Sequence, residues 1–201
     1  MDERLPVSRF VLFFGLLIVG LAADLLTKAW VFNNYFDPEI AREQAHGQFV
    51  AFWWIEGVFG VQPSTNPGAL FGMGAGLSFY FAMFSLVAIV GIVVWLFVFR
   101  AAHDRWLTFS LGLVSGGILG NMYDRVGLGA KPSYPEEIRD NVRDWILFRL
   151  EGVPFFDPWP NFNIADSVLV VGAAMLFIHS FVLYKEELNE QTEELSPTTE
   201  S

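Results

Sequence analysis

Four long runs of apolar residues organise the chain. Phe10–Ala23 is an unbroken apolar run that continues past Asp24 to Phe32. Residues 77–99 carry no charge, residues 106–122 are uncharged and rich in Gly and Ser, and residues 167–184 hold a single His. A helix needs about 20 apolar residues to cross the hydrocarbon core of a bilayer. The pattern therefore predicts four transmembrane helices, at about 10–32, 77–99, 106–123 and 167–184.

The first run has an alternative interpretation as a cleaved signal peptide, because Leu21-Ala22-Ala23 has the small residues of a cleavage site. Two features oppose it. The apolar run continues past Asp24, and the flank that precedes it, Met1-Asp-Glu-Arg, is mixed in charge rather than basic.

Two long loops, 33–76 and 124–166, lie on one side of the membrane in this topology, and both termini lie on the other. Lysine and arginine totals do not discriminate between the sides, but the weight of short loops in the positive-inside rule favours cytoplasmic termini. Residues 48–62 are rich in aromatic and β-branched residues and predict short strands or a hairpin at the membrane surface. The proline-rich loop 124–166 is expected to be mostly irregular, with one helical stretch at about 136–150.

These elements define an all-α membrane protein of four transmembrane helices with a small extramembrane β-rich cradle, or lid, on the outer face. We expect one domain, 1–185. The remaining segment, 186–201, is acidic and is expected to be a disordered tail.

Composition removes several classes of function. The net charge of −10 argues against nucleic-acid binding, which needs a basic surface. The chain has no cysteine, which excludes thiol catalysis and cysteine-ligated metals. Three histidines and no HExxH motif leave few ligands for zinc, so we expect no metal and no other cofactor.

The polar residues at membrane level gather on the side that carries the long loops. They are Asp24, Lys28, Asn66, Asn121, Asp124, Arg125 and Asp166. Ionisable groups are costly at membrane depth, so their convergence predicts a functional site. A small proton-coupled transporter could use the same carboxylates, but a transporter is expected to hold them near the midplane, accessible from both sides.

Paired carboxylates are the chemistry that these residues best support. Two carboxyl groups that share a water can hydrolyse an amide, since one accepts a proton from the water while the other donates one to the carbonyl. Two alternatives stay open. The aspartates could cap helices or form ion pairs with Lys28 and Arg125. A nucleophilic Ser115 is the other, although a Gly- and Ser-rich segment is more typical of close helix packing.

Five short motifs occur in order along the chain: Asp24-Leu-Leu-Thr-Lys28, Asn66-Pro-Gly68-Ala-Leu-Phe71, Gly120-Asn121-Met-Tyr-Asp124-Arg125, Val142-Arg-Asp144-Trp-Ile146 and Phe162-Asn163-Ile-Ala165-Asp166. Together, and in their placement against the four spans, they resemble the bacterial lipoprotein signal peptidase (signal peptidase II) family. The resemblance covers nearly the whole chain outside the acidic tail.

This resemblance implies a multi-pass aspartyl endopeptidase of the bacterial inner membrane, with its active site at the outer, periplasmic face. Its substrates would be diacylglyceryl-modified prolipoproteins, cut just before the modified cysteine, and we expect a monomer that contacts membrane lipid. The resemblance assigns Asp144 and Asp166 as the catalytic dyad. It assigns supporting or substrate-binding roles to Asp24, Lys28, Asn66, Gly68, Asn121, Asp124, Arg125, Asn163 and Ala165.

The segment 126–143 is longer than is usual in the family and brings a rival to Asp144. Asp140 lies four residues earlier, but Val142 and Trp145-Ile146 around Asp144 fit the motif better. Presenilin-type proteases also use two aspartates, and Tyr123-Asp124 resembles one of their motifs. Their second motif, Gly-x-Gly-Asp, does not occur in this sequence.

Overall fold

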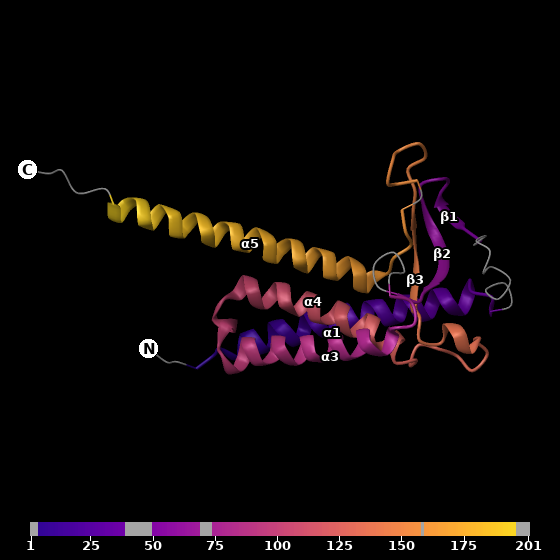
Figure 1. Cartoon of the computed structure of the whole chain (residues 1–201), viewed down its shortest axis with the longest axis horizontal. Helices are drawn as coiled ribbons and strands as arrows, with labels where there is room; N and C mark the ends of the chain where they lie inside the picture. The colour runs from indigo at the N-terminus through magenta and orange to yellow at the C-terminus, as the bar shows by residue number, and fades with distance from the viewer. Residues whose placement is uncertain (1–3, 39–49, 69–73, 158, 196–201) are drawn as a thin grey trace, which may run out of the picture.

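The computed structural model describes residues 4–38, 50–68, 74–157 and 159–195, and for 186–195 it describes the backbone alone. Four long helices form the body of the protein: α1 (Val7–Asn34), α3 (Ser78–Val93), α4 (Arg105–Arg125) and α5 (Ile164–Leu195). A π-helical turn, Val94–Val98, extends α3, and a 3₁₀ turn, Ala101–His103, leads into α4. Figure 1 shows α1, α3 and α4 side by side, while α5 diverges from them along its length.

Three of these helices are long and apolar enough to cross a membrane: Val7–Asn34, Ser78–Val98 and Ile164–Lys185. They coincide with three of the four predicted spans. The fourth predicted span, 106–123, is helical and corresponds to α4, but α4 is less apolar than the other three helices and is not among those apolar enough to cross a membrane. The physical reason is its position, because α4 packs against α1, α3 and α5 and turns Ser110, Ser115 and Asn121 into the protein rather than toward lipid.

Glycines allow α4 to approach its neighbours closely, as expected for a Gly- and Ser-rich segment. A side chain at Gly116 would lie 2.9 Å from the Leu17 carbonyl of α1, and one at Gly117 would lie 2.5 Å from the Ala165 carbonyl of α5. Both contacts are shorter than real Cβ atoms tolerate. Ser115 is fully buried in this helix packing, which leaves no access for a substrate and removes it as a candidate nucleophile.

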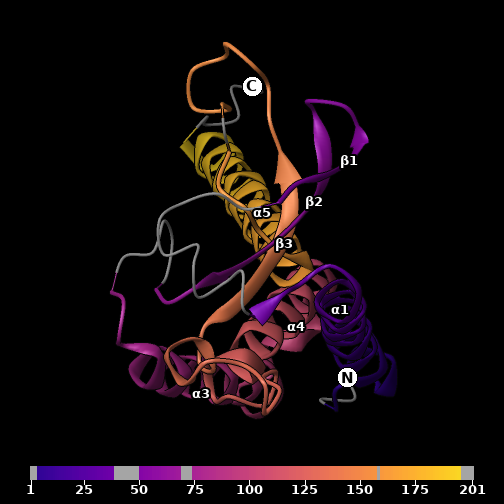
Figure 2. The ribbon, with the colours of Figure 1, turned by 90° about the vertical axis from the view of Figure 1, so that its right-hand side faces the viewer.

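A three-stranded antiparallel sheet stands across one end of the helices (Figures 1 and 2). Its strands are β1 (Phe52–Ile55), β2 (Phe59–Asn66) and β3 (Val142–Phe148), in the order β1-β2-β3. The hairpin expected within 48–62 is therefore present, although 48 and 49 lie outside the described residues. The helical stretch expected at 136–150 is wrong: it holds a 3₁₀ turn, Glu136–Ile138, followed by β3.

The physical reason for this error is the partner of the segment. Apolar and polar residues do not alternate regularly along Val142–Phe148, and nearly every position is buried. A strand has this pattern when it is covered on both faces. One edge pairs with β2, and the other meets Phe162 through a bridge at Ile146. A core of Val31, Phe32, Val61, Tyr134 and Trp145 joins the sheet to the end of α1.

The C-terminal helix is longer than predicted. α5 continues to Leu195, through the first part of the tail 186–201 that the sequence predicts to be disordered, and 196–201 lie outside the described residues. The beginning of α1 and the end of α5 both lie at the end of the bundle opposite the sheet (Figure 1).

Candidate active site

Asp144 and Asp166 come together where the sheet meets the end of the helices. Asp144 lies on β3 and is 3% exposed, while Asp166 occupies the first turn of α5. Asn163 connects them: its Nδ2 donates to Asp144 Oδ1 at 2.7 Å, and its Oδ1 accepts from the backbone N–H of Asp166 at 2.9 Å. The rival Asp140 is exposed at the turn before β3, outside this cluster.

The first turn of α5 explains the place of Asp166. The sequence leaves open that Asp166 is the helix N-cap, but Ile164 begins the helix, so Asn163 is the cap. The backbone N–H of Asn163 in turn donates to Asp166 Oδ2 at 3.2 Å, which completes a reciprocal capping box. The other carboxylate oxygen, Oδ1, accepts from Asn121 Nδ2 at 2.8 Å.

Burial and charge act together on Asp144. Its removal from water, and then the nearby negative charge of Asp166, raise the pKa of Asp144 to about 7. The positive charge of Lys28 and hydrogen bonds from the side chains of Asn163 and Asn66 oppose this rise. A carboxyl group with this pKa is protonated in a large fraction of molecules near neutral pH.

A buried network of charges lies directly beneath the two aspartates. Lys28 is fully buried, and its Nζ contacts Asp24 Oδ2 at 2.7 Å, Asp124 Oδ2 at 3.0 Å and Asn121 Oδ1 at 3.1 Å. Asp24 also accepts from the backbone N–H of Ala165 at 2.9 Å, so α1 caps the beginning of α5. Ala165 leaves no room at Gly120, where a Cβ would lie 3.1 Å from the Ala165 Cβ and 2.6 Å from Asp24 Oδ2.

The remaining predicted residues border the same site. Arg125 Nη2 donates to the Gly68 carbonyl at 3.4 Å, and its guanidinium lies 5.3 Å from the centre of the Phe81 ring. Asn66 Oδ1 accepts from the Gly68 N–H at 3.0 Å. The rest of the Asn66 motif, Ala69–Phe71, lies outside the described residues. The structure thus brings all eleven predicted site residues to one end of the bundle, at the face that carries the sheet.

The sequence leaves Arg143 unassigned, although it offers Lys28 and Arg125 as ion-pair partners of the aspartates. Asp124 contacts Lys28 and Arg143, with 2.7 Å between Arg143 Nη2 and Asp124 Oδ1, rather than the adjacent Arg125. The reason is the helix geometry, because consecutive residues point in different directions around α4. Asn161 is also missed; its Nδ2 donates to the Gln62 carbonyl and to Ser64 Oγ beside the site.

A cavity of about 1040 Å³ opens in front of the two aspartates. Asp144, Asp166, Asn121 and Arg125 lie on its polar side. Its apolar wall includes Leu169, Val170 and Val171 of α5 and Ile118 of α4. Ser85 of α3 also lines the cavity. The cavity therefore lies between α3 and α5, and a ligand in it would touch both the carboxyl groups and the apolar face of a membrane helix.

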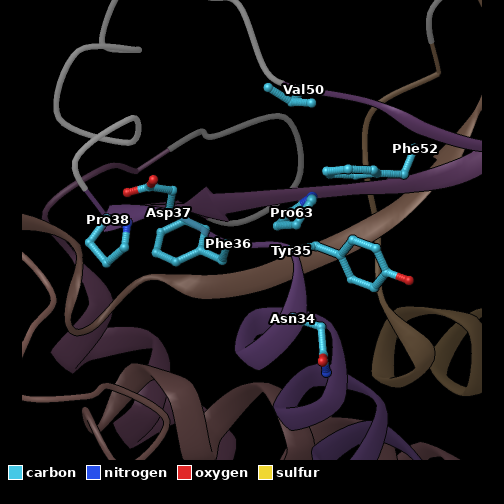
Figure 3. A pocket seen from close by; sticks show the side chains of 8 residues that line it. All are labelled: Asn34, Tyr35, Phe36, Asp37, Pro38, Val50, Phe52 and Pro63. Carbon is cyan, nitrogen blue, oxygen red and sulfur yellow. The ribbon is translucent and has the colours of Figure 1, made fainter.

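A second cavity, of about 570 Å³, lies between the end of α1 and the sheet (Figure 3). Its wall contains Tyr35, Phe36 and Phe52 together with polar Asn34 and Asp37. None of the predicted site residues lines it. Within the described residues, no group of three or more histidine, aspartate and glutamate side chains is placed to hold a metal ion.

A family model and several known proteins match this chain over most of its length. A model of the family "Signal peptidase (SPase) II" matches residues 16–182. A lipoprotein signal peptidase of Rhodopirellula baltica is 47% identical over 176 residues, covering 88% of this chain and 74% of that protein. One from Pseudomonas aeruginosa is 36% identical over 168 residues, covering 82% of this chain and 84% of the other.

Solved structures support the fold. One, described as a bacterial membrane enzyme at 2.3 Å resolution, superposes with a TM-score of 0.61 at 20% identity and covers 98% of this chain and 97% of its own. A second, at 1.9 Å resolution, has a TM-score of 0.60 at 21% identity and covers 88% and 94%. The chain belongs to the signal peptidase II family, the membrane-bound aspartic-type peptidases of bacteria that remove the signal peptide from prolipoproteins.

Proposed function

We propose that this protein cleaves prolipoproteins just before a diacylglyceryl-modified cysteine and that Asp144 and Asp166 perform the reaction. The observation that carries the proposal is the pair of carboxyl groups joined through Asn163 at the wall of a cavity with an apolar side. Such a cavity suits a substrate that has both an amide to be cut and acyl chains to be buried.

The two carboxyl groups have different environments, which suits them to different roles. Asp166 accepts hydrogen bonds from Asn121 Nδ2 and from the backbone N–H of Asn163, at the positive end of the α5 dipole. We assign Asp166 as the base that takes a proton from the attacking water. Asp144, whose pKa is about 7, is the acid that donates a proton to the oxygen of the scissile carbonyl.

The surrounding residues hold these two groups in place. Asn163 and Asn66 donate to Asp144, Asn121 donates to Asp166, and Asp24 fixes the N-terminus of α5 through Ala165. Lys28 forms ion pairs with the two buried carboxylates behind them, Asp24 and Asp124. Arg125 and Gly68, joined by a hydrogen bond at the rim of the cavity, are placed to contact the substrate backbone.

The arrangement of the helices supports a location and an orientation in the cell. We place the protein in the inner membrane as a monomer, with cytoplasmic termini and the sheet at the periplasmic face. Both helix ends nearest the termini lie opposite the sheet, and the cavity between α3 and α5 faces the region where acyl chains would lie. Substrate could then enter from the lipid phase.

The substrate assignment is tested with the purified full chain in detergent and two peptides that differ only in the diacylglyceryl group on cysteine. Mass spectrometry should detect a fragment that begins with the modified cysteine, and the unmodified peptide should remain intact. Equal cleavage of both peptides would contradict the assignment of lipid recognition. No cleavage of either would contradict the proposed activity.

A further inference from the structure

The proposed mechanism makes no use of Arg143, although this arginine is 7% exposed and directly precedes Asp144. Successive residues of a strand point to opposite faces. Arg143 therefore points away from the cavity, toward α4 and α1, where its guanidinium meets Asp124 and lies 5.7 Å from the centre of the Phe32 ring.

Arg143 and Asp124 are joined by two hydrogen bonds and one further ion-pair contact. The backbone N–H of Arg143 donates to Asp124 Oδ2 at 3.1 Å, and the Nε of its side chain donates to Oδ1 at 2.8 Å. Nη2 approaches the same Oδ1 at 2.7 Å. Main chain and side chain of one residue on β3 are thus bound to a single carboxylate at the end of α4, a charge-assisted geometry that only a guanidinium fork provides.

The hydrogen-bond ladder between β2 and β3 is interrupted next to Asp144, so the contact between Arg143 and Asp124 adds to what holds β3 in place. β2 and β3 pair regularly at Phe59–Val61 and again at Ser64–Asn66, but a bulge lies between Val61 and Ser64. Pro63 within the bulge has no N–H to donate. Asp144 still pairs with Ser64, but the N–H of the next residue, Trp145, donates to the Phe162 carbonyl on the other edge, so β2 does not hold the chain directly after Asp144.

Gly129, in the long segment 126–143, lies against the Arg143–Asp124 pair. A Cβ at Gly129 would overlap Asp124 Oδ1 and would lie 2.7 Å from Arg143 Nη2, so only glycine fits against it. The charges behind the site are balanced by this arrangement, because Asp24 and Asp124 face Lys28 and Arg143. Removal of Arg143 would leave two buried carboxylates with one cation.

We propose that Arg143 is a positioning residue for catalysis: its fork on Asp124, covered by Gly129, fixes the register and direction of β3 so that the Asp144 side chain faces Asp166. The proposal rests on the proposed function, since it concerns the geometry of that dyad. It assigns a role both to the arginine inside the Val-x-Asp motif and to the glycine in the lengthened segment.

The test compares Arg143→Ala, Arg143→Lys and Gly129→Ala with the parent chain and with Gly15→Ala, whose added Cβ meets nothing within 4 Å. Steady-state cleavage of the diacylglyceryl peptide gives kcat and KM over a range of pH. We expect Arg143→Ala to lower kcat about 10- to 100-fold, the scale expected when a reacting group is displaced, with KM within about twofold. Gly129→Ala should lower kcat in the same direction, and Gly15→Ala should match the parent.

The pH profile distinguishes positioning from a loss of folded protein. The charged groups that face Asp144 are Asp166 on α5, Lys28 on α1 and Arg125 on α4. Loss of the Arg143 charge leaves an unbalanced negative charge behind them, which favours the protonated form of Asp144. In Arg143→Ala, the alkaline limb of the pH–kcat profile should therefore move to higher pH. It should keep its parental position in Arg143→Lys and Gly129→Ala, which retain the cation.

The outcomes separate the two proposals. A parent chain that fails to cleave contradicts the proposed function. A parent that cleaves, beside an Arg143→Ala variant with parental kcat and an unmoved alkaline limb, overturns the role of Arg143 alone. If the Arg143 variants lose activity only in proportion to the fraction of folded protein, and Gly129→Ala keeps parental kcat, the role of Arg143 is structural and the inference is wrong.

Discussion

Asn163 is the residue that makes the two aspartates a unit. A single amide contacts both sides of the pair, with Nδ2 on Asp144 and Oδ1 on the Asp166 backbone, and it begins α5 at the same time. The resemblance places Asn163 and Asp166 in one motif, but the sequence alone offers Asp166 as the N-cap, and the structure shows Asn163 in that position with Asp166 as its capping-box partner. The third contact, to Asp144, depends on how β3 meets α5 and is not contained in local sequence.

Asp144 governs the pH dependence that we expect of the reaction. With a pKa of about 7, its acid form is depleted as pH rises, so kcat should fall tenfold per pH unit well above pH 7. A pH–kcat profile of the parent chain checks this. A rate that keeps rising through pH 8 would show that Asp144 is not the acid.

The free energy of unfolding should also depend on pH through Asp144, and the raised pKa sets the direction of this dependence. The pKa of Asp144 is higher in the folded than in the unfolded chain, so the folded state binds its proton more tightly. The corresponding stabilisation is complete below about pH 4 and is lost as pH rises through 7. Asp144→Asn has no such proton to lose, so its unfolding temperature relative to the parent should rise between pH 4 and 7.

At the scale of the elements, hydrophobic patterning predicts the helices and local composition predicts the β1–β2 hairpin. Strand β3 could not be predicted in this way. Val142, Trp145, Ile146 and Phe148 favour a strand, but nearly every position of the segment is buried, so it lacks the alternation of apolar and polar residues that marks a half-buried strand. Its pairing with β2 and Phe162 is set by tertiary structure. The burial of α4 is a second feature of this kind, since a helix surrounded by others needs small residues more than apolar ones.

The close contact between α4 and the start of α5 leads to a prediction at Gly120. In Gly120→Ala, the new methyl group meets Asp24 Oδ2 and the Ala165 Cβ, and must separate α5 from α4. We expect a loss of about 1–3 kcal/mol in stability, as is typical of overpacked cores, and a larger loss of cleavage because Asp166 moves with α5. Gly91→Ala in α3 is the matched control, since nothing lies within 4 Å of its added Cβ. Thermal unfolding in detergent and cleavage rates measure both effects, and equal behaviour of the two variants would contradict the predicted contact.

At the scale of the whole molecule, the site is one-sided. All the predicted site residues lie at the sheet end, whereas the other end holds the pair His179 and Asp104, whose Nε2 and Oδ2 are 2.5 Å apart. Sequence predicts this asymmetry because successive spans alternate in direction, so the polar ends of the first and third spans and the polar start of the fourth lie on one side. The cavity, which residues from α3, α4, the sheet and the first turns of α5 line together, depends on tertiary packing.

The proposed orientation is open to direct measurement because the chain has no cysteine of its own. Glu151→Cys lies in the loop after β3, and His103→Cys lies in the turn between α3 and α4. In intact cells whose outer membrane has been made permeable, an impermeant maleimide should label the first and spare the second. The reverse labelling would place the site in the cytoplasm and contradict the orientation.

The central claim is that Asp144 and Asp166 carry out the cleavage, and its most direct test is the cleavage rate of three carboxyl-to-amide variants. Asp144→Asn and Asp166→Asn keep the shape of each side chain but can neither donate nor accept the required proton. The exposed Asp140→Asn is the matched control four residues from Asp144. With all three folded in detergent, we predict that Asp144→Asn and Asp166→Asn each lose about 100- to 10,000-fold in kcat, the range for removal of one proton-transfer role, while Asp140→Asn cleaves at the parental rate. Substantial cleavage by either dyad variant, or loss of activity in Asp140→Asn alone, would contradict the account.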